Sequence, residues 1–235
     1  MPIAANLARV RERIAAAARR AGRHPDEVAL MAVTKTFGAD PIGEAHAAGL
    51  RLFGENRVQE FAGKAESVSA LAGAEWRLIG HLQSNKAARA AELFRGIDSL
   101  DSLRLAEKLD AAAQKLGRKM PVLLEINLGG EISKSGLDPH SPELEELLLA
   151  APQFHALDFR GLMAIPPFTE DSEGARLYFR RLRELRGAIA KRNLPSITMD
   201  ELSMGMSHDF EVAIEEGSTC VRIGTAIFGE RPQVR

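Results

Sequence analysis

Short apolar runs alternate along the chain with segments whose apolar residues recur every three or four positions. The apolar runs predict eight strands, near residues 28–34, 51–54, 76–80, 97–100, 121–126, 159–165, 198–203 and 219–223. The first run, Val28 to Thr34, is almost continuously apolar, which is typical of parallel strands covered on both faces. We therefore expect a parallel sheet with helices on its faces.

Helical spacing is clearest in the first segment, about residues 3 to 21. Its apolar positions form one stripe, and the arginines between them are expected to be solvated on the outer face. The stripe consists of Leu7, Val10, Ile14 and Ala18. Two later stripes are interpreted as core faces of helices: Leu105, Leu109, Ala112 and Leu116, and Tyr178, Leu182, Leu185 and Ile189.

Several residue pairs mark where helices begin. Asp40-Pro41 offers an N-cap followed by proline at the first helical position, and Gly49 is expected to end that helix. Asn56 with Gln59 has the form of a capping box. Ser141-Pro142 repeats the cap and proline pattern.

Eight strands, each followed by a helical segment, predict an α/β fold, a closed (β/α)8 TIM barrel with an extra N-terminal helix. An open, doubly wound sheet remains the alternative, because periodicity does not determine whether a sheet closes. The 235 residues, 45% of them hydrophobic, suit a single domain spanning residues 1–235.

The balance of charge argues against two classes of partner. Thirty-one basic and thirty-two acidic side chains give a net charge of -1, so we expect no nucleic acid and no membrane as partner. The N-terminus lacks the apolar region of a signal peptide. The single cysteine, Cys220, lies in an apolar stretch and is expected to be a small buried residue. These features predict a cytoplasmic protein.

Lys35 follows the first apolar run, where active sites of barrels gather. A lysine in a half-apolar pocket has a lowered pKa, so its neutral amine can attack a carbonyl and form a Schiff base. The ordinary alternative is a lysine that extends from the strand end to the surface.

The loops after the seventh and eighth strands predict a phosphate site. Barrels often bind phosphate there through backbone N–H groups. Gly205 and Ser207 follow one strand, and Gly224 and Thr225 follow the other. Ser207 is expected to cap the next helix. Two acidic residues in that helix, Asp209 and Glu211, would either oppose a bound anion or complement the helix dipole. The alternative is that the glycine, serine and threonine residues of these loops simply form ordinary turns.

Arg222 lies within the last predicted strand and points to the same side as Cys220. A buried guanidinium needs a partner. That partner is either a barrel carboxylate such as Glu125 or an acceptor atom of a cofactor. Lysine, phosphate cradle and arginine together predict a site for an aldehyde that bears a phosphate.

Long motifs identify a family resemblance over nearly the whole chain. They are "AVTKT", "FGENRVQE", "WRLIGHLQSNK", "LLEINLGGEISKSGL", "FRGLMAIPP" and "LSMGMSHDFEVAIEEGSTCVRIGTAIFG". The chain resembles the pyridoxal-phosphate homeostasis proteins, also called proline synthase co-transcribed homologues, which are similar to the N-terminal barrel domain of alanine racemase. The resemblance implies a role in vitamin B6 homeostasis and, indirectly, in the balance of amino and keto acids.

The resemblance also implies roles for individual residues. Lys35 would carry pyridoxal 5'-phosphate (PLP) as a covalent aldimine, and Arg222 would face the pyridine nitrogen. The residues implied around the phosphate are Ser203, Ser207, Gly224 and Thr225, and those implied to line the pocket are Asn56, His81 and Met204. We assign no catalytic residue and no metal ligand.

A carrier of PLP is the function that we expect, because an arginine at the ring nitrogen makes a weak electron sink. Alanine racemases use a tyrosine as second base, which is supplied with the help of a second domain and a second subunit. This chain ends eleven residues after Gly224, and its one tyrosine, Tyr178, lies on an apolar stripe. His81 could act as a base, although a loop histidine more often binds or supports. The alternatives are a PLP-dependent amino-acid racemase and a class I Schiff-base aldolase. We expect a monomer that transiently contacts PLP-dependent apoenzymes.

Overall fold

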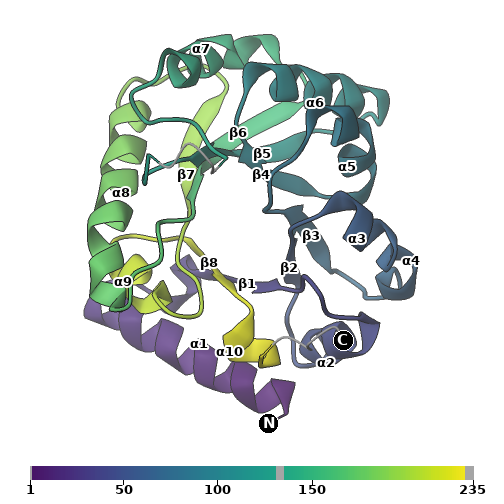
Figure 1. Ribbon diagram of the computed structural model, residues 1–235, viewed down its shortest axis with the longest axis vertical. Helices are drawn as coiled ribbons and strands as arrows, with labels where there is room; N and C mark the ends of the chain where they lie inside the picture. Colours follow the sequence, from purple (N-terminus) through teal and green to yellow (C-terminus); the bar gives the residue numbers. More distant parts are fainter. Residues whose placement is uncertain (1, 131–134, 231–235) are drawn as a thin grey trace.

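A computed structural model describes residues 2–130 and 135–230, and within them the strands form one closed parallel barrel in the order β1 to β8 (Figure 1). The eight strands are β1 (Ala29–Val33), β2 (Leu52–Glu55), β3 (Glu75–Leu78), β4 (Gly96–Leu100), β5 (Met120–Ile126), β6 (Leu157–Ala164), β7 (Ile197–Ser203) and β8 (Cys220–Ile223). Each predicted strand overlaps one of them. The middle of the motif "LLEINLGGEISKSGL", residues 131–134, lies outside the described residues.

Pairing between the first and last strands closes the barrel. Ala29 to Ala32 of β1 lie beside Cys220 to Ile223 of β8 in parallel register. The prediction of a (β/α)8 TIM barrel is therefore confirmed, and the open doubly wound sheet is wrong.

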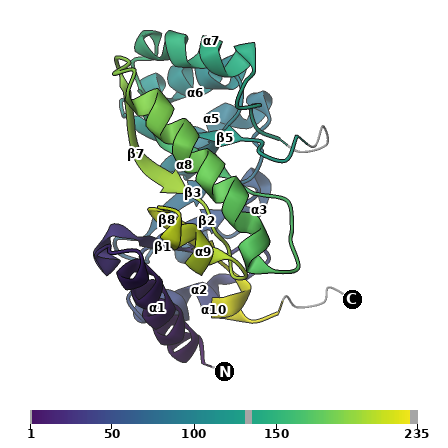
Figure 2. The ribbon, with the colours of Figure 1, turned by 90° about the vertical axis from the view of Figure 1, so that its left-hand side faces the viewer.

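Helices surround the barrel (Figures 1 and 2). They are α1 (Ile3–Arg20), α2 (Ala39–Ala47), α3 (Val58–Ala62), α4 (Ala65–Val68), α5 (Ala87–Leu93), α6 (Leu103–Lys115), α7 (Pro142–Ala150), α8 (Arg176–Ala190), α9 (Phe210–Glu215) and α10 (Thr225–Phe228). Within the described ranges, no helix is long and apolar enough to cross a membrane.

The extra N-terminal helix α1 packs against α9 and α10 at one end of the molecule (Figure 2). Its predicted apolar stripe is buried as expected. Its arginines, however, do more than contact solvent: Arg13 Nε lies 2.9 Å from Glu211 Oε1, and Arg20 Nε lies 2.8 Å from Glu215 Oε1. These ion pairs connect α1 to α9, which follows β7.

Two helices begin at residues other than those predicted. Gly38 is the N-cap of α2, so Asp40 and Pro41 lie inside its first turn. Arg57 is the N-cap of α3, and Asn56 forms no capping box. The backbone of Asn56 instead packs against Gly80, where a Cβ would lie 2.3 Å from the Asn56 carbonyl oxygen. The backbone that follows β2 therefore lies very close to the backbone that follows β3.

Two other helix boundaries are confirmed. Gly49 follows α2 with φ +88°, a backbone conformation that suits glycine. Ser141 caps α7, because its hydroxyl accepts a hydrogen bond from the Leu144 N–H at 3.3 Å.

The core stripes of α6 and α8 differ from the predicted stripes at one end each. Leu116 is exposed because α6 ends just before it. Tyr178 is half-buried, and the neighbouring Phe179 enters the core instead. Helix ends and rotation depend on packing against the barrel, which periodicity alone does not specify.

Alternate residues of the strands fill the inside of the barrel. A small apolar cluster there contains Met31, Val33, Ile79 and Cys220, and the large core cluster lies between strands and helices. Cys220 is buried as predicted, and burial raises the pKa of its thiol to about 12. Lys35 lies two residues beyond Val33, in the turn that follows β1.

Candidate functional site

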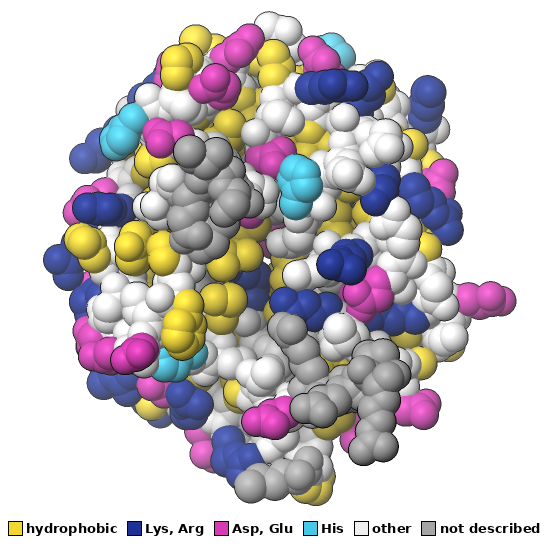
Figure 3. Space-filling view, in the orientation of Figure 1, with side chains coloured by type: hydrophobic (Ala, Val, Ile, Leu, Met, Phe, Trp, Pro, Cys, Tyr) yellow, Lys and Arg dark blue, Asp and Glu magenta, His cyan; other side chains and the backbone are white. Residues whose placement is uncertain are grey.

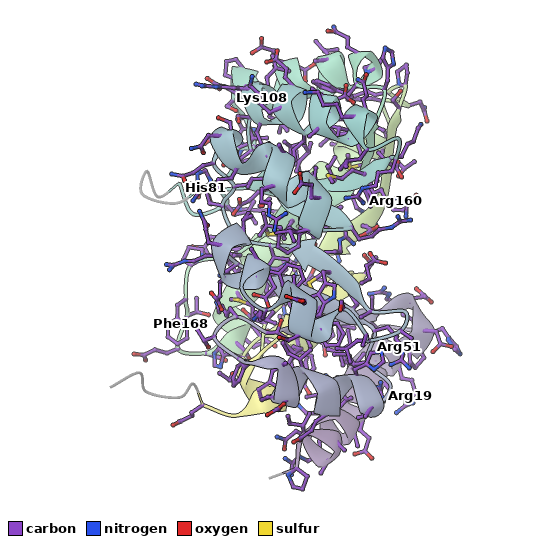
Figure 4. All side chains as sticks on the ribbon, turned by 90° about the vertical axis from the view of Figure 1, so that its right-hand side faces the viewer. Arg19, Arg51, His81, Lys108, Arg160 and Phe168 are labelled. Carbon is purple, nitrogen blue, oxygen red and sulfur yellow. The ribbon has the colours of Figure 1, made fainter. Side chains whose placement is uncertain are left out.

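The candidate site lies on the face where the strands end at their carboxyl termini. His81, which follows β3, and Phe168, which follows β6, lie on the same side of the molecule (Figure 4). Arg51 precedes β2 and lies toward the opposite side. On the first face, a central depression has basic side chains on one side and hydrophobic side chains on the other (Figure 3).

Lys35 occupies a turn directly after β1. The strand pairing extends to Thr34, whose N–H donates to the Gly54 carbonyl at 3.0 Å. The Phe37 N–H then donates back to the Thr34 carbonyl at 3.1 Å, so Thr34 to Phe37 form a tight turn. Lys35 is half-buried in this turn. The side chain of Lys35 is therefore partly withdrawn from solvent at the end of β1 where the barrel opens.

Arg222 is buried inside the barrel, with 2% of its surface exposed. Its guanidinium donates to Ser203 Oγ at 2.7 Å and to the Ala164 carbonyl at 2.8 Å. Burial lowers the pKa of Arg222, and nearby acidic groups oppose this change. Within residues 2–130 and 135–230, no ion pair joins Arg222 to Glu125, and its direct partners are Ser203 and the Ala164 carbonyl. The carboxylates of Asp98, Asp209 and Glu125 act on it only from a greater distance.

Ser207 contacts the start of α10 rather than the start of α9. Its Oγ accepts hydrogen bonds from the backbone N–H groups of Gly224 and Ala226, each at 3.3 Å. The predicted cap of α9 is therefore wrong: Asp209 occupies the N-cap position, and its Oδ1 accepts from the Met206 N–H at 2.7 Å. Two N–H groups thus converge on one oxygen beside the exposed Thr225.

Gly205 makes this arrangement of loops possible. Its φ is +94°, and a Cβ there would lie 2.6 Å from the Ala213 Cβ. Its carbonyl accepts a hydrogen bond from the Arg222 N–H at 2.9 Å. Glycine is required because any side chain would push the β7 loop away from α9 and loosen its contact with β8.

Asn56 and His81 line a pocket of about 570 Å³ beside α3, together with Glu60 and other polar residues. His81 Nδ1 lies 3.0 Å from Asp101 Oδ2, which orients the ring. Glu60 accepts a hydrogen bond from the Thr36 N–H, so the pocket adjoins the Lys35 turn. None of Lys35, Ser203, Ser207 or Arg222 lines this pocket.

Met204 is a predicted site residue whose side chain lies in the core rather than at the barrel mouth. Its side chain is fully buried in the large cluster between strands and helices. Ser203, its neighbour in the chain, faces the barrel interior and contacts Arg222. Because side chains alternate along a strand, only one of the two can face the mouth.

A buried ion pair next to the Lys35 turn was not predicted. Lys64 Nζ lies 2.7 Å from Glu55 Oε1, and Glu55 is fully buried. Burial raises the pKa of Glu55, and Lys64 opposes the rise. Glu55 lies in the motif "FGENRVQE", which could have drawn attention to it, whereas Lys64 lies in no motif. Among the described residues, no group of three or more His, Cys, Asp or Glu side chains could hold a metal ion.

Comparisons with known proteins agree with this architecture. The family model described as "Alanine racemase, N-terminal domain" matches residues 5–232. The chain is 46% identical over 226 residues to the pyridoxal phosphate homeostasis protein of Aquifex aeolicus, covering 96% of each chain. It is 47% identical over 233 residues to the protein of that name from Escherichia coli K12, covering 97% of each.

A solved structure is also similar. PipY of Synechococcus elongatus PCC7942, with PLP bound, is 38% identical and superposes with a TM-score of 0.84, over 97% of this chain and 100% of PipY. Identity at this level over nearly full lengths establishes common ancestry as well as a shared fold. The chain therefore belongs to the pyridoxal phosphate homeostasis protein family.

Proposed function

We propose that this protein binds PLP as a Schiff base on Lys35 and carries it for vitamin B6 homeostasis, with little or no turnover. The observation that carries the proposal is the placement of three groups at the carboxyl ends of adjacent strands. Lys35 follows β1, the buried Arg222 of β8 contacts Ser203 at the end of β7, and the N–H groups that converge on Ser207 follow β8, where Gly224 lies beside Val33 of β1. The relatives' names and the PLP in PipY support the same ligand.

The residues present suit the chemical groups of PLP. Its aldehyde requires a primary amine, which Lys35 would supply. Its phosphate requires several N–H or O–H donors, and the first turn of α10 already directs the N–H groups of Gly224 and Ala226 at one oxygen. Thr225 and Ser207 add hydroxyls beside them. Arg222 would provide a donor for the pyridine nitrogen.

PLP supplies an electrophilic aldehyde joined to a ring that can accept electrons. Arg222 would work against that acceptance, because a guanidinium next to the ring nitrogen disfavours its protonation. Tyr178 lies half-buried on α8, and His81 is held by Asp101 at the mouth. This arrangement favours holding the cofactor over carbanion chemistry.

The test is borohydride reduction followed by proteolysis and mass spectrometry. The wild-type protein should show one pyridoxyl group, on Lys35. Lys35→Ala should show none while it keeps the fold, because alanine at a turn opens no core cavity. Lys108→Ala, on the exposed face of α6, is the matched control and should retain the adduct. A reducible adduct in Lys35→Ala would refute the assignment.

The same preparations distinguish the alternative functions. Steady formation of D-amino acids that depends on Lys35 would favour a racemase. Purification without a visible chromophore, with borohydride trapping only after a carbonyl substrate is added, would favour an aldolase.

Delivery of PLP to apoenzymes is part of the proposal. It can be measured by mixing the loaded protein with an apoenzyme in the presence of a phosphatase that destroys free PLP. Activation that persists under these conditions would support transfer by contact. Sedimentation at several protein concentrations tests the proposed monomer.

A further inference from the structure

A second lysine, Lys64, holds the turn that carries Lys35. Lys64 lies between α3 and α4, and 12% of its side chain is exposed. Its Nζ is 2.9 Å from the Thr34 carbonyl, 3.1 Å from the Phe37 carbonyl and 2.7 Å from Glu55 Oε1. An ammonium group has three N–H donors, and here each has an acceptor. Lys64 thus connects both ends of the turn to a buried carboxylate.

These contacts lie on the side of β1 opposite to Val33, which belongs to the small cluster inside the barrel. Thr34 follows Val33, so its side chain points the other way, and Lys35 is the next residue, in the turn. The Thr34 hydroxyl donates to Glu55 Oε1, the same oxygen that Lys64 contacts. Anchoring Thr34 toward the helices therefore directs Lys35 toward the mouth of the barrel.

The backbone of the turn is unfavourable by itself. Thr36 has φ +68°, in the left-handed region that β-branched residues avoid. Its N–H donates to Glu60, which lies 3.9 Å from Lys64 Nζ. Residues in such conformations persist only where surrounding contacts hold them. The contacts of Lys64, Glu55 and Glu60 meet this requirement.

We propose that Lys64 is a positioning residue for Lys35: its ammonium fixes the turn of residues 34–37 so that the Lys35 amine meets the aldehyde of PLP. The proposal rests on the proposed function, in which Lys35 binds PLP covalently. Lys64 does not itself form the bond, because its charged ammonium is occupied by three acceptors on the helix side.

Lys64→Met is the direct test, because methionine retains an unbranched stem and removes the donors. Three quantities are measured: PLP affinity by absorbance titration, the fraction trapped on Lys35 by borohydride, and amide hydrogen exchange of residues 34–37 in the PLP-free chain. We expect affinity to fall about tenfold or more, since small misplacements of a reacting group are costly. Exchange in the turn should become faster.

A second variant separates positioning from stability. Lys64→Met leaves Glu55 buried without its partner, which lowers stability for a reason unrelated to PLP. In Lys64→Met/Glu55→Gln the uncompensated charge is removed, so much of the lost thermal stability should return. The N–H donors to the Thr34 and Phe37 carbonyls are still missing in this double variant. Its PLP affinity should therefore stay low, and amide hydrogen exchange of residues 34–37 should stay fast. Lys108→Met is the control on a distant exposed surface.

The outcomes are distinguishable. PLP affinity of Lys64→Met within about twofold of wild type, with unchanged exchange, would overturn the proposal. Recovery of affinity together with stability in the double variant would also overturn it, because Lys64 would then have only a structural role. If the wild-type protein shows no adduct on Lys35, the proposed function fails, whereas the exchange measurement still tests whether Lys64 holds the turn.

Discussion

Arg77→Met offers the sharpest test of how the barrel interior is stabilised. Arg77 of β3 has 5% of its surface exposed. Its Nε lies 2.7 Å from Asp98 Oδ1 of β4, and its Nη1 lies 2.6 Å from Glu201 Oε2 of β7. Asp98 is fully buried. One guanidinium therefore neutralises carboxylates from two strands on different sides of the barrel.

The expected loss follows from the burial of these charges. Removing one partner of a buried ion pair costs roughly 3–5 kcal/mol, because the remaining charge is left unpaired. Burial raises the pKa of Asp98 and Arg77 opposes this rise, so in the variant Asp98 can take up a proton, which moves the loss toward the lower end of this range. For a protein of 235 residues, a loss of 3–5 kcal/mol corresponds to a decrease in Tm of roughly 6–20 °C.

Arg160→Met is the matched control. Arg160 also approaches Glu201, at 3.7 Å, but 49% of its side chain is exposed. Exposed ion pairs contribute at most about 1 kcal/mol, because solvent screens them. The two variants thus remove the same type of side chain from the same carboxylate in different surroundings.

Urea unfolding followed by fluorescence and far-UV circular dichroism provides the measurement. The single tryptophan, Trp76, precedes Arg77 and stacks on Phe53 with ring centroids 4.8 Å apart, so its emission reports this part of the barrel. The slope of unfolding free energy with urea should stay constant between variants. Arg77→Met/Asp98→Leu should recover most of the loss, because it removes the unpaired charge as well.

Equal small losses in Arg77→Met and Arg160→Met would refute the reasoning, since the buried pair would then contribute no more than the exposed one. If Arg77→Met/Asp98→Leu is as unstable as Arg77→Met, the loss of stability comes from the packing of the arginine stem rather than from its charge.

Three further predictions concern the mouth of the barrel. Gly205→Ala should lower the free energy of unfolding by about 2 kcal/mol or more, because alanine there has an unfavourable φ and a Cβ 2.6 Å from that of Ala213. Gly229→Ala is the control in the same unfolding assay: its φ is +84° but its surroundings are open, so the loss should be about 1 kcal/mol. Burial raises the pKa of Glu125 above 4.5, so the folded state binds the proton more tightly than the unfolded state. The stability of the wild type should therefore fall as pH rises through the pKa of Glu125 in the folded state. Glu125→Gln should flatten that part of the pH profile of Tm. Arg222→Gln should raise the pKa seen in the visible titration of bound PLP, because a positive charge next to the ring nitrogen is lost; an unchanged titration would place the ring away from residue 222.

The sequence determined the local elements of this protein. The apolar runs found every strand of the described barrel, because burial on both faces leaves few polar residues within a strand. The stripe of α1 identified its buried face for the same reason. Strand alternation also assigned Arg222 and Cys220 to one side of their strand, since neighbouring side chains must point in opposite directions, and both are buried.

Only the tertiary structure decided which of these elements meet. Closure of the barrel depended on pairing between β1 and β8, almost two hundred positions apart, and no local pattern encodes that contact. Ser207 found its partners at the start of α10 rather than in its own helix, and Lys64 reached back to Thr34. Patterns along a chain reflect burial and backbone preference at each position, whereas the partner of a polar group depends on which distant segments the fold brings within hydrogen-bond distance.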